Sequence, residues 1–168
     1  MKLIECVPNF SEGRRPEIVQ EIAGAVSAVP GIKMLDQSSD ASHNRSVITF
    51  VGAPAAVKKA AFSAAQKAAE LIDMEHHRGE HPRIGAADVI PLIPVSGVSM
   101  EDCVVLAREL GQEIGEKLGI PVYLYEEAAL TAERKNLAAV RRGEYEGLKE
   151  AIGQPGRHPD FGPLRLHP

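Results

Sequence analysis

The densest group of side chains suited to acid–base chemistry lies in residues 73–83, which read DMEHHRGEHPR. Gly79 and Pro82 would break a helix, so we expect this segment to be a loop. A loop this rich in titratable groups, next to an apolar strand, is unfavourable unless water solvates these groups or they take part in function. An imidazole titrates near working pH, and His81 is therefore a candidate general acid and base.

Two other interpretations apply to the histidines of this loop. His76 and His77 follow a predicted helix, whose negative end favours positive charge, so both would then be surface charges. His77 and His81 stand four residues apart, a spacing that zinc sites use. Such sites need an unbroken helix to aim both rings, so a metal is not expected here. Residue types alone leave the catalytic and the surface-charge interpretations open.

Two further polar segments follow predicted strands. Residues 9–13 read NFSEG, and residues 38–45 read SSDASHNR. Serine, aspartate and asparagine in such segments commonly cap their own turn, and spacing alone indicates no more than that. The sequence contains neither a GxGxxG phosphate loop nor a serine-centred nucleophile elbow.

Strand and helix signals alternate along the chain. Apolar or β-branched runs predict strands at residues 2–8, 32–35, 47–51, 89–95 and 121–125. The strand at 89–95 contains two prolines and is expected at a sheet edge. Apolar residues at helical spacing predict helices at residues 16–29, 54–72, 100–118, 131–142 and 145–152. Ser99 and Asp102 form a plausible capping box for the third helix.

The order strand, helix, strand, strand, helix, strand predicts an α+β fold with a ferredoxin-like sheet and helices on one face. A C-terminal α-β-α extension should follow it. We expect residues 1–152 to form one domain. Residues 153–168 hold three glycines and four prolines, which is typical of a linker or an extended arm.

The bulk composition narrows the function classes. A formal net charge of −4 argues against a general nucleic-acid-binding protein. No apolar run approaches the roughly 20 residues of a membrane span, and the N-terminus lacks the apolar run of a signal peptide. Cys6 and Cys103 both fall in apolar patterns and are expected to be buried thiols. A cytoplasmic location is the default expectation.

Several long strings of mixed polarity resemble the signatures of the formiminotransferase family. They are ECVPNFSEG (5–13), NRSVITFVG (44–52), HRGEHPRIGAADV (77–89), VYLY (122–125), RGEYE (142–146) and PDFGP (159–163). The resemblance runs in register over essentially the whole chain, and it is to the N-terminal subdomain of these enzymes.

This resemblance implies transfer of a formimino group from N-formimino-L-glutamate to N5 of tetrahydrofolate, a step of histidine breakdown. Tetrahydrofolate is then a substrate, and no metal is implied. The catalytic histidine of the family falls on His81, and folate contacts fall in the tail from about Gly162 onward. The candidates for binding substrate or folate are Asn9, Asn44, Arg45, Glu80, Arg83, Asp160, Gly162 and Pro163.

The chain departs from the family pattern in two respects. Vertebrate members carry an assisting aspartate where this chain has Ser38, and Asp36 and Asp40 are the carboxylates available here. Family enzymes also hold folate in a tunnel between two similar subdomains, of which this chain resembles the first. The expected partners are folate, formiminoglutamate and either a second subdomain or a homo-oligomer mate, but no nucleic acid or membrane. The alternative function is a non-catalytic relative that binds folate or a partner chain.

Overall fold

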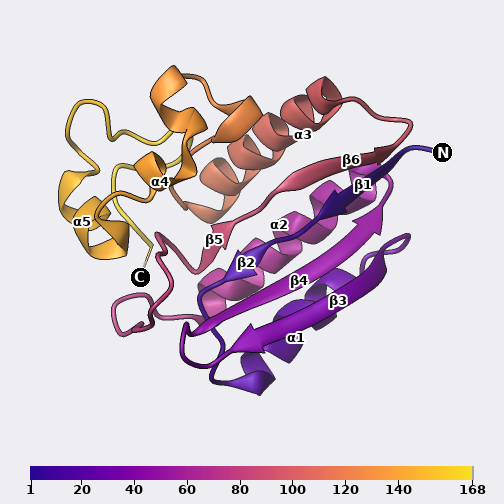
Figure 1. Cartoon of the computed structure of the whole chain (residues 1–168), viewed down its shortest axis with the longest axis horizontal. Coiled ribbons are helices and arrows are strands. Elements are labelled where there is room, and N and C mark those ends of the chain that lie inside the picture. Colours follow the sequence, from indigo (N-terminus) through magenta and orange to yellow (C-terminus); the bar gives the residue numbers. More distant parts are fainter. Residues whose placement is uncertain (168) are drawn as a thin grey trace.

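An antiparallel sheet forms from residues 3–96 (Figure 1). The structure, a computed structural model, describes residues 1–167. Its strands are β1 (Leu3–Cys6), β2 (Asn9–Phe10), β3 (Lys33–Asp40), β4 (Arg45–Gly52), β5 (Ala87–Val89) and β6 (Leu92–Ser96). They are ordered β5-β2-β4-β1-β6, and β3 pairs with β4. The chain is therefore a mixed α/β structure.

Prolines interrupt two of the strand paths. Pro8 separates β1 from β2, and Pro91 lies between β5 and β6. Proline has no N–H to donate to the ladder. Their carbonyl groups still accept bonds of 3.2 Å, from the N–H of Ile48 to Pro8 and from that of Val7 to Pro91. Within the described residues β5 and β6 pair on one side only, so the predicted edge strand is confirmed, in two pieces.

Strand β3 is longer than the sequence predicted. The apolar run ends near residue 35, and the polar residues after it were expected to form a loop. Instead, β3 continues to Asp40, which pairs with Arg45 across the antiparallel ladder. The connection shrinks to a short turn in which Asn44 has a left-handed φ of 51°. Ladder hydrogen bonds to β4 outweigh the turn preference of serine and aspartate.

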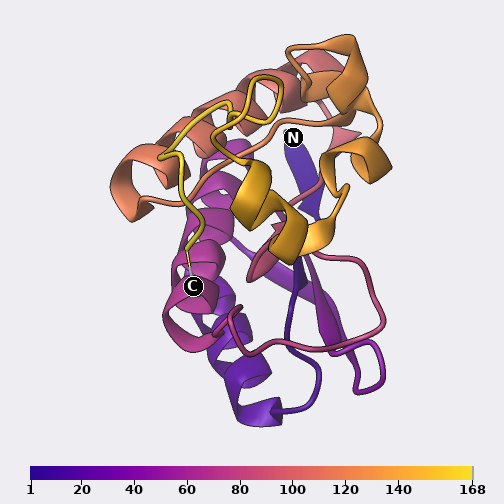
Figure 2. The ribbon, with the colours of Figure 1, turned by 90° about the vertical axis from the view of Figure 1, so that its left-hand side faces the viewer.

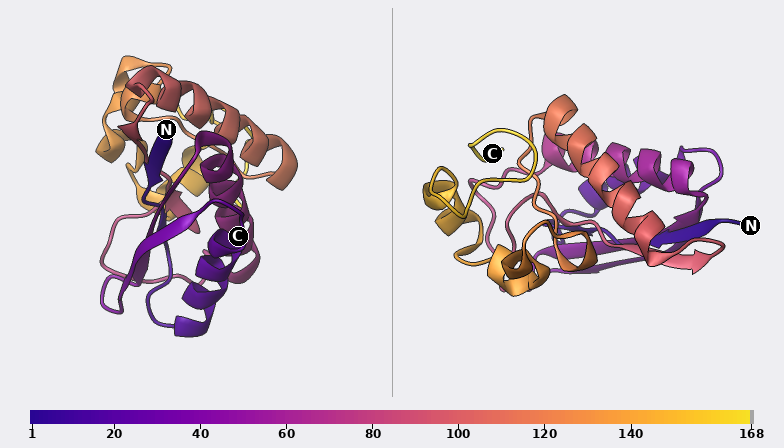
Figure 3. Two further views of the ribbon diagram at one scale, coloured as in Figure 1. Left: turned by 90° about the vertical axis from the view of Figure 1, so that its right-hand side faces the viewer. Right: turned by 90° about the horizontal axis from the view of Figure 1, so that it is seen from above.

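Helices α1 (Pro16–Ser27) and α2 (Pro54–Leu71) pack together on one face of the sheet (Figure 3). Each begins with a proline, which suits the first helical position because no N–H is needed there. The buried side of α2 is almost entirely alanine, which lets the helix approach the sheet closely. Alternate residues of β4, among them Ile48 and Phe50, are fully buried beneath these helices.

Helix α3 (Met100–Glu113) packs against α2 and β6. The predicted capping box is confirmed, because Ser99 and Asp102 exchange side-chain and backbone hydrogen bonds of 2.9 and 3.1 Å. A π-helical turn, η1 (Ile114–Leu118), extends α3. It ends at Gly119, whose φ is 66°, a left-handed conformation that glycine adopts at no steric cost.

The remaining helices are short and gather near β5 (Figure 1). They are the 3₁₀ turns η2 (Glu126–Ala128) and η3 (Ala132–Lys135), then α4 (Leu137–Val140) and α5 (Glu144–Ala151). The predicted helix at 131–142 is thus two short pieces. The predicted strand at 121–125 was wrong, because only one isolated bridge forms there, between Val122 and Phe161. Strand propensity without a neighbouring partner does not produce a strand.

The tail after residue 152 folds back over α3 and the segment that follows it (Figure 2). Asp160 accepts from the N–H of Leu124 at 2.7 Å and from Arg134 at 3.1 Å. Phe161 lies against Gly111 and Gly115, where a β-carbon would come within 3.2 and 2.8 Å of it. These contacts join the tail to the rest of the chain.

Both cysteines, Cys6 and Cys103, are buried free thiols, as predicted. Burial raises the pKa of each thiol, so each is held in its protonated form. None of the helices formed by residues 1–167 has the length and apolar character needed to cross a membrane.

Candidate active site

The histidine-rich loop between α2 and β5 rests on the turn between β3 and β4. The Asn44 side chain donates to the carbonyl of Arg78 at 3.0 Å, and the N–H of Glu80 donates to the carbonyl of Ser42 at 3.4 Å. Gly79 is required by this approach, since a β-carbon there would lie 2.3 Å from the carbonyl oxygen of His43. Two segments about 35 residues apart in sequence therefore share one site, together with Ser11, which donates to Gly85 at 2.7 Å.

His81 lies half-buried in this loop with its ring nitrogen against an arginine. The distance from Nε2 of His81 to Nη1 of Arg45 is 2.6 Å. Arginine has only donors, so Nε2 must carry a lone pair, and His81 is neutral with its proton on Nδ1. The ring of His43 stands edge-on to it, with centroids 6.3 Å apart.

The charges around His81 favour its neutral form. Burial lowers the pKa of His81 most, and Arg45 and Arg141 lower it further. Asp88 and the backbone of Pro82 act in the opposite direction but do not reverse the shift. A neutral imidazole at working pH is the form that accepts a proton.

His77 is buried and belongs to a hydrogen-bonded network, so its interpretation as a surface charge was wrong. Its Nδ1 accepts from Nε of Arg83 at 2.8 Å, which leaves the proton on Nε2 to be donated to the carbonyl of Asn44 at 3.1 Å. Burial and Arg83 lower the pKa of His77. His76 does lie at the surface, with 85% of its side chain exposed and Nδ1 2.6 Å from Asp73.

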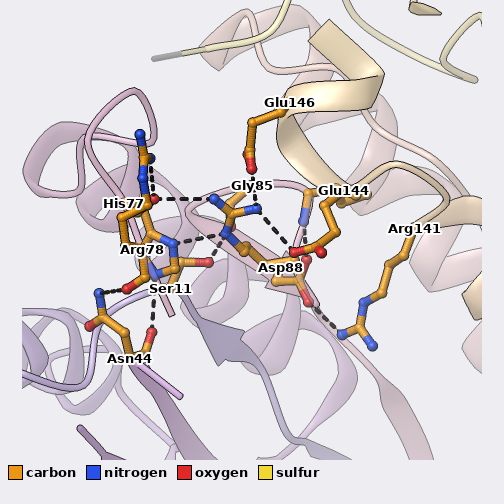
Figure 4. Close-up of polar contacts among 11 residues, drawn as sticks. Ser11, Asn44, His77, Arg78, Gly85, Asp88, Arg141, Glu144 and Glu146 are labelled. Atoms are coloured by element: carbon orange, nitrogen blue, oxygen red, sulfur yellow. Dashed lines mark hydrogen bonds and ion pairs between the residues drawn. The ribbon is translucent and has the colours of Figure 1, made fainter. Parts of the chain in front are cut away.

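Arg83 is only 5% exposed and connects three parts of the chain. Its partners His77, Glu144 and Glu146 are labelled in Figure 4. Besides His77, its guanidinium donates to Glu144 at 3.1 Å and to Glu146 at 2.8 Å. Its own carbonyl accepts from the N–H of Tyr145 at 2.9 Å. The first turn of α5 is thereby fixed to the loop that carries His81. Binding of substrate by Arg83 stays a prediction, while an anchoring role follows directly from these contacts.

Asp88 and Arg141 form a second buried ion pair, which sequence reasoning missed as part of the site. Asp88 also accepts from the N–H of Ile84 at 2.6 Å. Burial raises the pKa of Asp88, although Arg141 opposes the shift. Nε of Arg141 is buried and has no hydrogen-bond partner among the described residues. Asp88 lies in a string that resembles the family, but nothing local in the sequence identifies Arg141 as its partner.

The remaining residues that the sequence predicted to bind substrate or folate lie in different parts of the structure. Asn9 donates to the carbonyl of Val7 at 3.0 Å, and buried Asn44 accepts from the N–H of Gly13 at 2.9 Å. Glu80 is exposed beside His81. In the tail, a β-carbon on Gly162 would meet the carbonyl of Ile120 at 2.4 Å.

Asp160, Gly162 and Pro163 therefore belong to the tail, and the contacts of Asp160 and Gly162 are with residues 120–134 rather than with His81. Ser38 pairs with Val47 in the sheet, and Asp36 pairs with Thr49.

Asp88 is the carboxylate whose charge acts on His81. Of the two carboxylates expected from the sequence, Asp40 is connected to His81 through a neighbouring ring. It forms an ion pair of 3.1 Å with Nδ1 of His43, whose ring in turn meets His81. Hydrogen bonds from His43 lower the pKa of Asp40 and hold it ionised. The structure thus connects Asp40 to His81 only through His43.

Two cavities meet at Asp88. The small polar one is lined by Phe10, Ser11, His43, Asn44, Arg45, His77, His81, Arg83 and Asp88. The larger one has a volume of about 450 Å³ and is mainly apolar, with walls from β5, β6, α3 and residues 120–128. No group of three potential metal-ligating side chains occurs among residues 1–167.

Fold and site together define a mixed α/β domain with a histidine–arginine cluster where a loop rests on the β3–β4 turn. Residues 3–168 match the family described as formiminotransferase domain, N-terminal subdomain. The chain belongs to this family, which confirms the resemblance seen in the sequence.

Three curated relatives illustrate the similarity. The chain is 56% identical over 165 residues to glutamate formimidoyltransferase of Thermoplasma acidophilum, covering 97% of the chain and 54% of the relative. It is 44% identical over 167 residues to the enzyme of that name from Streptococcus pyogenes, covering 99% of the chain and 56% of the relative. It is 54% identical over 167 residues to formimidoyltransferase-cyclodeaminase of Gallus gallus, covering 99% of the chain and 31% of the relative. The chain thus spans from 31% to 56% of the length of these relatives.

Proposed function

We propose that this chain is the catalytic N-terminal subdomain of a glutamate formimidoyltransferase. It transfers the formimino group of N-formimino-L-glutamate to N5 of tetrahydrofolate. The observation that carries this proposal is the neutral imidazole of His81, whose Nε2 lone pair lies at Arg45. The names of relatives up to 56% identical support the reaction class.

The chemistry needs one group that takes a proton and later returns it. N5 of tetrahydrofolate attacks the amidine carbon, and Nε2 of His81 accepts the proton that N5 loses. The tetrahedral intermediate then breaks its bond to the glutamate nitrogen, which takes that proton from His81 as it leaves. One imidazole serves both steps, since its pKa is close enough to working pH for both directions.

Substrate binding falls to polar groups around His81 and in the tail. Arg45 is suited to a carboxylate through its guanidinium fork. The apolar cavity shares Asp88 with the polar site and has the volume of a small-molecule site, which supports binding of a flat ring in it. The remaining substrate- or folate-binding candidates are Asn9, Asn44, Glu80, Arg83, Asp160, Gly162 and Pro163.

The domain organisation is part of the same proposal. Residues 1–152 form a ferredoxin-like unit with a C-terminal extension, and residues 153–168 lead toward a second subdomain. The sheet face away from α1 and α2 would receive that subdomain. Support comes from apolar side chains on this face, such as Ile93 and Val95, which are 41% and 53% exposed, and from the part of each relative that the chain does not span.

The test adds the part of a relative that this chain does not span. The chain is combined with the remainder of the T. acidophilum enzyme, and glutamate release from formiminoglutamate is measured with tetrahydrofolate present. His81→Ala should lower turnover by at least about 100-fold, the usual contribution of a positioned general acid–base. His76→Ala is the matched control, because that ring is exposed, and it should match the wild-type chain.

The outcomes separate two functions. Wild-type turnover in His81→Ala would exclude the proposed mechanism. Folate binding without any turnover in the assembled wild-type protein would instead indicate a non-catalytic folate-binding relative.

A further inference from the structure

The basic nitrogen of His81 is not available as the structure stands. Arg45 donates to Nε2 at 2.6 Å, and this bond occupies the lone pair that would accept a proton. The other ring nitrogen carries the proton in the neutral form, so it offers no base either. Before His81 can act, Arg45 must move away from it.

Among residues 1–167, Arg45 lacks the carboxylate partner that Arg83 and Arg141 have. Arg83 and Arg141 each form an ion pair with a glutamate or an aspartate. Among residues 1–167 no carboxylate lies within 4.0 Å of the Arg45 guanidinium, and Asp40, its neighbour across the ladder, pairs with His43 instead. Arg45 therefore holds a neutral acceptor where an anion would bind it more strongly.

Arg45 also has the freedom to exchange partners. It is half-buried at the first position of β4, and it shares the small polar cavity with His81. Because Arg45 is partly exposed, its long side chain can change rotamer without any backbone movement. A carboxylate adds its own negative charge and can accept two parallel hydrogen bonds from the guanidinium fork, so an incoming carboxylate would displace the neutral imidazole.

We propose that Arg45 is a substrate-operated switch: it covers Nε2 of His81 in the empty site and releases it when a substrate carboxylate takes the guanidinium. This inference rests on the proposed function and names the group that turns the base on. His81 then becomes basic only when the donor substrate is in place. The energy of binding a remote carboxylate is used at the reacting centre, as in other enzymes that exploit non-reacting parts of a substrate.

The carboxylate is that of the donor, formiminoglutamate. Its α-carboxylate is on the carbon that bears the amidine nitrogen, so a guanidinium next to His81 can reach it. The carboxylates of tetrahydrofolate lie beyond the aminobenzoyl group, at the far end from N5. With N5 at His81, those carboxylates cannot also reach Arg45.

The test observes His81 directly and needs no turnover. Side-chain ¹⁵N resonances of His81 are recorded by NMR for the 168-residue chain, alone and combined with the remainder of the T. acidophilum enzyme. The probes are N-acetyl-L-glutamate, an unreactive donor analogue, and p-aminobenzoyl-L-glutamate, the carboxylate end of folate. The variants are Arg45→Met and, as a matched control, Arg108→Met, since the hydrogen bonds that exposed Arg108 makes within residues 1–167 go to the carbonyl of Ala128.

Three results are expected. N-acetyl-L-glutamate should move the Nε2 resonance of His81 and raise its pKa, whereas p-aminobenzoyl-L-glutamate should do neither. In Arg45→Met the pKa should be raised already without ligand, and the response to N-acetyl-L-glutamate should be lost. Arg108→Met should behave as the wild-type chain.

Other results overturn the proposal. An unchanged His81 pKa in Arg45→Met would show that Arg45 does not cover Nε2. No response to N-acetyl-L-glutamate in either sample, or a response only to p-aminobenzoyl-L-glutamate, would remove the donor as the operator. An assembled wild-type protein with the expected NMR responses but no turnover would refute the reaction proposed above and leave the switch standing.

Discussion

Two histidines of one loop owe their tautomers to two arginines. Arg45 donates to Nε2 of His81, and Arg83 donates to Nδ1 of His77, so opposite ring nitrogens carry the proton. This difference in protonated nitrogen gives the two histidines different hydrogen-bonding roles. The N–H of buried His77 donates to the carbonyl of Asn44, whereas the lone pair of half-buried His81 accepts from Arg45, which has no carboxylate partner among residues 1–167.

The switch makes a prediction about pH. His81 must be neutral to accept a proton, so activity should fall as the pH drops through its pKa. In the free protein, burial and then Arg45 and Arg141 lower that pKa below 6.5. In the substrate complex Arg45 has left His81, so its pKa is higher. The acidic limb of kcat should therefore lie at higher pH than that of kcat/KM.

The measurement is a pair of pH–rate profiles on the assembled enzyme. Arg45→Met should bring the two limbs together by moving that of kcat/KM upward, while Arg108→Met should leave both in place. Coincident limbs in the wild-type protein would contradict the release of Arg45 in the complex.

The sequence predicted the catalytic candidate but not its setting. His81 stands out by its residue type and by the family strings around it. The buried state of His77 and the pairing of Asp88 with Arg141 depend on contacts between positions 6 to 61 residues apart. Local sequence patterns carry no information about such partners, so a histidine such as His77 is interpreted as a surface residue from its type alone.

At the scale of elements, the sequence predicted best where an element is amphipathic or capped. Helices α1, α2 and α3 begin within a residue of their predicted starts, since proline and a capping box mark them. The polar half of β3 was missed because an exposed strand has no apolar alternation to reveal it. The strand expected at residues 121–125 failed for lack of a pairing partner, which only the fold determines.

Replacement by alanine should change stability in opposite directions at two glycines, one in the contact between η1 and the tail and one on the open side of α1. In Gly115→Ala the new methyl group would lie 2.7 Å from the backbone nitrogen of Gly162, which forces the tail away. We expect a loss of about 1–3 kcal/mol in the free energy of unfolding. In Gly24→Ala the methyl group meets nothing within 4 Å in the middle of α1, and a gain of about 0.5–1 kcal/mol is expected.

Urea denaturation monitored by circular dichroism measures both. A Gly115→Ala variant as stable as the wild-type chain would mean that the tail does not pack on η1 in solution.

At the scale of the whole molecule, the sheet has one face covered by helices and one that is not. Ile93 pairs with Glu5 on the uncovered face, whereas Ile4, the next residue of β1, points to the helices and is fully buried. Apolar side chains on such a face favour association with another protein surface. The chain spans 54% of the T. acidophilum relative, so a surface of that kind is expected on the proposed organisation.

The uncovered face can be tested without touching the catalytic site. Ile93→Lys should leave the stability of the chain within about 0.5 kcal/mol of wild type, because the side chain is already 41% exposed. It should weaken binding to the remainder of the T. acidophilum enzyme at least about 10-fold, since burying an unpaired ammonium group is strongly unfavourable. Calorimetry measures this affinity.

Val105→Lys is the control, on the exposed side of α3 with 56% exposure. It should bind as the wild-type chain does. Equal weakening by both variants would argue against the sheet face as the docking surface.

The anchoring of Arg83 by the first turn of α5 has a consequence for the newly made protein. Every strand of the sheet and helices α1 and α2 lie within residues 3–96, and α3 then packs against α2 and β6. The guanidinium of Arg83, which anchors the loop that carries His81, has its partners in Glu144 and Glu146, some fifty residues after the end of β6. On the ribosome, a growing chain that has not yet reached α5 would therefore carry His81 on an unsecured loop.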